Sequence, residues 1–273
     1  MPSRPERFVA ACVQMRSADD KERNLEVATA HVETAVAAGA TLVVLPETFS
    51  WRGPATHDHA SSEPVGGPTI ERLAALARRH RLTLVAGSIL EHPGDAAAPY
   101  NTSVVLGPDG DRLAVYRKMH LFDVSIPGKV EVRESARRGR GAEVVTADTP
   151  VGRLGLSVCY DLRFPELYRA LARAGAEILC VPSAFTFPTG AAHWEVLLRA
   201  RAIENQCWVV AANQHGASGL GHQDYGHSMI VDPWGTVVAR ASDGERVITA
   251  EIDLGLLEKV RREMPCLDHA RLV

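Results

Sequence analysis

Three residues that could carry out covalent chemistry each come at or just after the end of a short run of strand-forming residues. Glu47 follows residues 41–45, Lys118 follows residues 114–117, and Cys159 follows residues 155–158. A thiolate is a strong nucleophile, a carboxylate can move a proton, and a fixed ammonium can stabilise an oxyanion. Each residue alone also fits an ordinary role, as a helix-capping or solvated glutamate, a surface lysine or a core cysteine. Their interpretation therefore depends on the elements that position them.

Short β-branched runs alternate with helical patterns along most of the chain, which is typical of a layered α/β fold. No repeat or linker interrupts this alternation, so the sequence predicts one domain over residues 1–273. Strands are predicted over 8–14, 41–45, 82–89, 101–106, 114–117, 155–158, 178–181, 208–212, 228–231, 237–241 and 247–252. Helices are predicted over 24–38, 68–79, 165–174 and 193–205, and loops over 51–64, 92–99, 136–141 and 217–224.

The strand that ends at residue 158 is followed closely by the helix that begins at Pro165, which places Cys159 at a tight corner. A thiol at such a corner is exposed at the end of the sheet, and the backbone N–H of Tyr160 can point at the same centre. The charged residues that follow are expected to form ion pairs that fix the corner: Asp161, Arg163 and Glu166. Three other cysteines lie in apolar runs and are expected to be buried, whereas the last lies in a polar tail: Cys12, Cys180, Cys207 and Cys266.

The composition excludes several classes of protein. Of 273 residues, 46% are hydrophobic and 23% are charged, which argues against a disordered chain, a collagen-like repeat and a coiled coil. No apolar run is long enough to cross a bilayer, and the charged start runs into a predicted strand instead of a signal peptide. Five cysteines without a CxxC pair suggest reduced thiols, so we expect a cytoplasmic protein. A net charge of −3 gives no reason to expect nucleic acid or an anionic membrane as a partner.

Three segments resemble the nitrilase superfamily of carbon–nitrogen hydrolases. The resemblance lies in residues 45–49, 116–123 and 157–167, and it extends over about residues 8–265 through the stretches 183–185, 192–204, 225–229 and 231–235. It implies a four-layer αββα sandwich and a thiol amidohydrolase that cleaves a linear amide through a cysteine thioester. It implies neither a metal nor another cofactor.

The resemblance also implies a role for each motif residue. Cys159 would be the nucleophile, Glu47 the general base and acid, and Lys118 the oxyanion stabiliser together with the Tyr160 amide. Glu134 matches a second glutamate of the family that holds Lys118 or positions substrate, although it also lies in a charge-rich segment that could be solvated.

The most similar branch of the family acts on amides of 2-oxo acids. The implied substrate is deaminated glutathione, cleaved to 2-oxoglutarate and Cys-Gly, with 2-oxoglutaramate or an N-carbamoyl amine as alternatives. Candidates for the substrate carboxylate are His193, Tyr225 and His227, for each of which a capping or core role is about as frequent. The resemblance further implies a homodimer or a higher homo-oligomer, although the loop at 137–141 and the short tail after Pro265 depart from the family pattern.

Other functions are weaker interpretations of the same sequence. A metal hydrolase could use His57, Asp58 and His59, or Cys266 with His269, but neither cluster has a complete zinc ligand set. An inactive binding protein of the same fold would not need the intact Glu, Lys and Cys set. The arginine-rich run 137–140 on an acidic chain is more typical of a solvated loop than of a nucleic-acid site.

Overall fold

The computed structural model describes residues 5–92, 94, 98–128 and 130–272. One sheet has the strand order β17-β1-β2-β3-β5-β4, with β6 paired to β5. Its strands are β1 (Arg7–Gln14), β2 (Ala40–Val44), β3 (Thr83–Val85), β4 (Ile89–Glu91), β5 (Tyr100–Leu106), β6 (Arg112–Arg117) and β17 (Arg246–Asp253). Its central strands β1, β2 and β3 run parallel to one another. On either side of them, β17 pairs antiparallel with β1, and β5 pairs antiparallel with β3.

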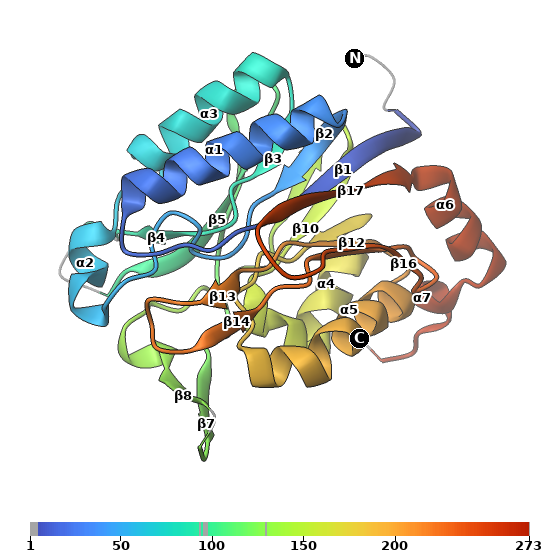
Figure 1. Cartoon of the computed structure of the whole chain (residues 1–273). Coiled ribbons are helices and arrows are strands. Elements are labelled where there is room, and N and C mark those ends of the chain that lie inside the picture. The colour runs from blue at the N-terminus through green and yellow to red at the C-terminus, as the bar shows by residue number, and fades with distance from the viewer. Residues whose placement is uncertain (1–4, 93, 95–97, 129, 273) are drawn as a thin grey trace.

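The second sheet has the order β16-β15-β12-β11-β10-β9. Its strands are β9 (Thr146–Thr149), β10 (Gly152–Leu156), β11 (Ile178–Cys180), β12 (Trp208–Ala211), β15 (Met229–Val231) and β16 (Val237–Arg240). Two separate hairpins consist of β7 (Asp123–Ile126) with β8 (Val130–Arg133), and of β13 (His215–Ala217) with β14 (Gln223–Tyr225). The β7–β8 hairpin projects away from the body of the molecule (Figure 1).

Helices cover the outer faces of the two sheets, which confirms the predicted four-layer αββα sandwich. Helices α1 (Lys21–Ala37) and α3 (Pro68–His80) lie on one side, and α4 (Pro165–Arg173) and α5 (Phe187–Asn205) lie on the other (Figure 1). The remaining helices are short or terminal: α2 (Asp58–Ser61), α6 (Leu254–Glu263) and α7 (Cys266–His269), with 3-10 turns η1 (Ala55–His57), η2 (Glu134–Ala136) and η3 (Cys159–Arg163). Within the described ranges, no helix combines the length and apolar character needed to cross a membrane.

The strand β1 illustrates why the central strands are apolar throughout. Ala10 and Cys12 belong to the core between the two sheets, whereas Ala11 and Val13 belong to the core beneath α1 and α3. Successive side chains point to opposite faces of a strand, so a strand buried on both faces needs a continuous apolar run. The three cysteines of such runs are buried, as predicted, and Cys266 in the polar tail is exposed.

Several element predictions were wrong in detail. The single strand predicted over 82–89 is two strands, because the chain turns at Gly87 with φ +44 and a Cβ there would lie 2.0 Å from the carbonyl oxygen of Pro46. The helix predicted over 193–205 begins at Phe187, with Pro188 in its first turn. Both hairpins, β9, α6 and α7 were not predicted. Short helical turns interrupt the loop 51–64, β14 occupies part of 217–224, and the predicted loop 92–99 lies partly outside the described residues.

Candidate active site

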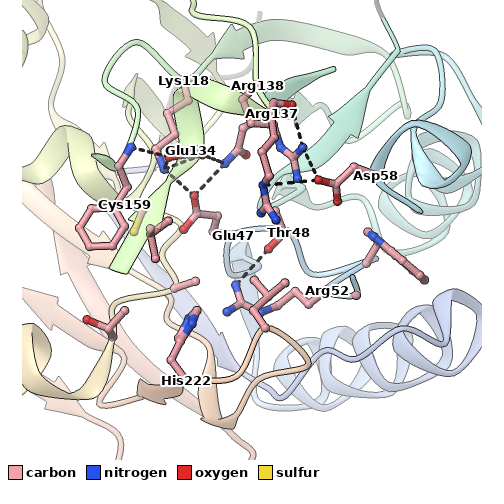
Figure 2. A pocket seen from close by; sticks show the side chains of 18 residues that line it. Glu47, Thr48, Arg52, Asp58, Lys118, Glu134, Arg137, Arg138, Cys159 and His222 are labelled. Carbon is pink, nitrogen blue, oxygen red and sulfur yellow. Dashed lines mark hydrogen bonds and ion pairs between the residues drawn. The ribbon is translucent and has the colours of Figure 1, made fainter. Parts of the chain in front are cut away.

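The ends of strands from both sheets bring the predicted residues to one pocket. Glu47 follows β2 and Lys118 follows β6 directly, whereas Cys159 begins the turn η3 after β10 of the other sheet. Glu134 begins η2 after the projecting hairpin. All four line the same pocket together with Asn101 of β5, and Figure 2 shows their side chains converging.

Lys118 lies between two carboxylates. Its Nζ is 2.9 Å from Glu47 Oε1 and 2.9 Å from Glu134 Oε2, and the side chain is only 2% exposed. The Asn101 amide nitrogen also donates to both carboxylates, at 2.8 Å to Glu47 and 3.3 Å to Glu134. Burial alone would lower the pKa of Lys118, but the charges of Glu134 and Glu47 outweigh it and raise that pKa well above its usual range. The lysine is therefore a fixed cation.

The backbone at Cys159 is held in a conformation that residues other than glycine rarely adopt. Cys159 has φ +50, in the left-handed region, and its N–H donates to the Pro182 carbonyl at 2.9 Å. Asp161 is completely buried and accepts from the Val158 N–H at 2.8 Å and from the Tyr116 hydroxyl at 2.7 Å. Such strained backbone persists only where its surroundings hold it in place, and it concentrates at functional sites.

The environment of the thiol keeps it protonated at neutral pH. Burial raises the pKa of Cys159 well above its usual range, and the negative charge of Glu47 raises it further. Lys118 and a hydrogen bond from the Ala184 backbone act in the opposite direction. The N–H of Tyr160 donates to no group among the described residues. The arrangement therefore holds a thiol, an adjacent proton acceptor, a fixed cation and a free backbone donor.

Of the three charged residues that follow Cys159, one fixes the corner as expected and two do not. Asp161 does fix the corner, through the hydrogen bonds given above and two more from the backbone and ring of His120. Arg163 pairs with no carboxylate among the described residues; its guanidinium lies 3.2 Å from the His193 ring and above the rings of Tyr160 and Phe185. Glu166 is exposed, so the predicted ion pairs of Arg163 and Glu166 were wrong.

The three candidates for binding a substrate carboxylate do not line this pocket. His193 is exposed on α5, where its ring contacts Arg163. Tyr225 and His227 stack on each other with ring centroids 4.3 Å apart, and the His227 ring bonds to the Tyr225 carbonyl. Their role in binding a substrate carboxylate stays a prediction.

Other polar residues line the pocket, which has a volume of about 90 Å³. Besides Asn101, the polar lining that the sequence did not assign to an amidase site consists of Thr48, Arg52, Asp58, Arg137, Arg138 and His222, together with Thr186. Apolar walls come from Trp51, Phe122, Val132 and Leu220. A cluster of arginines next to the second glutamate was visible in the sequence, but its burial was not.

The structure also removes the support for the metal-site interpretations. Asp58, the central residue of one histidine-flanked cluster, forms an ion pair with Arg138 at 2.7 Å. Across the residues described, no group of three or more histidine, cysteine, aspartate or glutamate side chains could hold a metal ion.

The fold agrees with comparison to known proteins. The sequence model of the carbon–nitrogen hydrolase family matches residues 9–262, so the chain belongs to the carbon–nitrogen hydrolases, which confirms the predicted family and the hydrolytic amidase class.

Among individual relatives, the chain is 49% identical to human deaminated glutathione amidase, over 97% of this chain and 82% of that protein. It is 41% identical to the chloroplastic omega-amidase of Arabidopsis thaliana, over 95% of this chain and 71% of that protein. The crystal structure of the Caenorhabditis elegans NitFhit protein superposes with a TM-score of 0.89 at 45% identity, covering 99% of this chain and 66% of that one. The chain spans 60% of the full length of that fusion protein.

Proposed function

We propose that Cys159 attacks the carbonyl carbon of a linear amide while Glu47 accepts the thiol proton. The observation that carries this proposal is the buried contact set in which Glu47 and Glu134 both hold Lys118 beside Cys159. Because the thiol of the free enzyme is protonated, the proton has to move as the Sγ–C bond forms. The oxyanion that develops is stabilised by the Lys118 ammonium and the free Tyr160 N–H.

The second half of the proposed reaction uses the same groups in reverse. Glu47 returns its proton to the leaving nitrogen, the C–N bond breaks, and a thioester remains on Cys159. Water then loses a proton to Glu47 and attacks the thioester, the C–S bond breaks, and the proton returns to the thiolate. In this scheme Glu134 keeps Lys118 charged and correctly placed, and Asn101 orients both glutamates.

The proposed substrate is deaminated glutathione, which would be hydrolysed to 2-oxoglutarate and Cys-Gly. The support is the 49% identity to human deaminated glutathione amidase and a pocket with arginines on its wall, which suits an anionic amide. The omega-amidase relative favours 2-oxoglutaramate as the second candidate. An N-carbamoyl amine is the third.

We further propose that residues 1–273 act as one hydrolase domain in a cytoplasmic homodimer. Glu47 and Cys159 follow strands of different sheets, so neither sheet alone would make the site. The apolar residues Val196 and Ile203 of α5 and nearby Trp234 are exposed, and the Ile203 side chain lies beside Gly235. Such a patch favours a second copy of the chain as its partner. The free cysteines suit a reducing compartment.

The experiment compares kcat/KM for deaminated glutathione, 2-oxoglutaramate and an N-carbamoyl amine in the wild type and in Cys159→Ala. The expected result is the highest kcat/KM for deaminated glutathione and no turnover of any amide by the variant. Undiminished turnover by Cys159→Ala would overturn the mechanism. A higher kcat/KM for either other amide would overturn the substrate assignment alone.

A further inference from the structure

The arginine run 137–140 divides between the pocket and the surface. Arg137 and Arg138 line the pocket, whereas Arg140 is exposed and does not. The turn η2 explains this placement, since it begins at Glu134 and the Arg137 N–H donates to the Glu134 carbonyl at 2.9 Å. One turn therefore directs the Glu134 carboxylate to Lys118 and carries Arg137 along the pocket wall. The expectation of a simple solvated loop was wrong for these two arginines.

Arg138 and Arg52, two of the three arginines that line the pocket, form buried ion pairs. Arg138 Nη1 lies 2.7 Å from Asp58 Oδ2, and both side chains are less than one-tenth exposed. Arg52 Nη2 lies 2.8 and 3.0 Å from the two oxygens of Asp224, again with both side chains buried, and its Nη1 donates to Thr48. Breaking such buried pairs is costly, so these arginines form fixed parts of the wall.

Arg137 is in a different position. Its only ion pair among the described residues is a long one, 3.6 Å from its Nε to the Asp58 oxygen that Arg138 already holds. Burial and the charge of Arg138 both lower the pKa of Arg137, so its charge is incompletely compensated. Its side chain is 30% exposed and extends along the pocket toward Thr48 and Arg52 (Figure 2). Of the three guanidinium groups, Arg137 is therefore the one without a close ion pair among the described residues.

We propose that Arg137 binds a carboxylate of the substrate and thereby makes the enzyme select anionic amides. A planar guanidinium matches a carboxylate in two parallel hydrogen bonds. Since Glu134 and Arg137 share one turn, the site also places that carboxylate at a fixed distance from the reacting centre. This inference rests on the proposed function and names the group that recognises its substrate.

The experiment measures kcat/KM for deaminated glutathione and for its dimethyl ester, which has the same scissile amide but no carboxylate. The enzymes are the wild type, Arg137→Met and the matched control Arg140→Met, which removes the same charge three residues away. If Arg137 forms a charge-assisted pair with the substrate carboxylate, Arg137→Met should raise KM for the acid. The ratio of kcat/KM for the acid to kcat/KM for the ester, the acid-to-ester selectivity, should then fall about 10- to 100-fold. Arg140→Met should leave the selectivity unchanged.

Other results would overturn the carboxylate site, either alone or together with the proposed substrate. Selectivity that is unaltered in Arg137→Met, or that falls equally in Arg140→Met, would overturn the carboxylate site while leaving the proposed function in place. A fall that comes entirely from kcat on both compounds would show that Arg137 only supports Glu134, and would also overturn it. A wild type that cleaves neither compound would overturn the proposed substrate and this inference together.

Discussion

Replacing Asp161 by asparagine tests how strongly the corner at Cys159 is held. Asp161 is completely buried and accepts four hydrogen bonds, from the Tyr116 hydroxyl, the Val158 N–H, and the N–H and ring of His120, at 2.7 to 3.0 Å. Asparagine keeps one acceptor oxygen but presents an amide to the donors on the other side. About two of the four bonds are therefore lost.

Hydrogen bonds to a charged group each contribute about 1.5–3 kcal/mol, so the loss of two in Asp161→Asn should lower the free energy of unfolding by about 3–6 kcal/mol. For a domain of this size that corresponds to a melting temperature lower by about 6–24 °C. The strained φ of Cys159 depends on the same contacts, so kcat should fall as well. Thermal and urea unfolding followed by circular dichroism give the first quantity, and amide turnover below the melting transition gives the second.

The control is Asp148→Asn, because Asp148 is an exposed aspartate that pairs with Arg153 at 2.7 Å. Exposed pairs contribute little, so the melting temperature of this variant should match the wild type. A change of less than about 1 kcal/mol for Asp161→Asn, or equal changes for the two variants, would refute the account of the corner.

Three further predictions concern the lysine cluster, the thiol and the assembly. Glu134→Gln should reduce kcat about 10²- to 10³-fold at a temperature where the variant is folded, because Lys118 is held less firmly as an oxyanion donor; a kcat within tenfold of the wild type would contradict this. The charge of Glu47 raises the pKa of Cys159, so Glu47→Gln should lower that pKa, speed alkylation by iodoacetamide at pH 7 and still abolish turnover. In the wild type, alkylation should accelerate as pH rises; slower alkylation in the variant would reverse the sign assigned to Glu47. Trp234→Glu should shift sedimenting dimers to monomers, and a wild type that sediments as a monomer would argue against the dimer.

Glu47, Lys118 and Cys159 could be predicted because each lies in a segment that resembles a motif of the nitrilase superfamily and follows a predicted strand. The alternation of apolar runs with helical patterns was enough to predict the layered fold, since a strand buried on both faces is a continuous apolar run in the sequence. Glu134 was found through a motif, and the structure places it 2.9 Å from Lys118. Its catalytic role, like those of the other three, stays a prediction.

Long-range placement explains what the sequence could not indicate. Asn101 lies in a predicted strand, but its contact with two glutamates depends on which strands are neighbours in the sheet. Arg52 and Asp224 are 172 positions apart, and nothing local in either segment indicates that they form a buried pair. His193 was chosen because it lies near a strand end, yet the earlier start of α5 leaves it on an exposed face. Side-chain direction at loops and helix starts thus depends on tertiary packing.

The most direct test of the central claim is to look for the acyl-enzyme itself. Wild type mixed with deaminated glutathione and quenched with acid within one turnover should contain a peptide that carries one 2-oxoglutaryl group on Cys159 by mass spectrometry. Cys159→Ala should show neither the adduct nor turnover. Turnover in the variant, or a 2-oxoglutaryl group on any other residue, would contradict the proposal that Cys159 is the nucleophile.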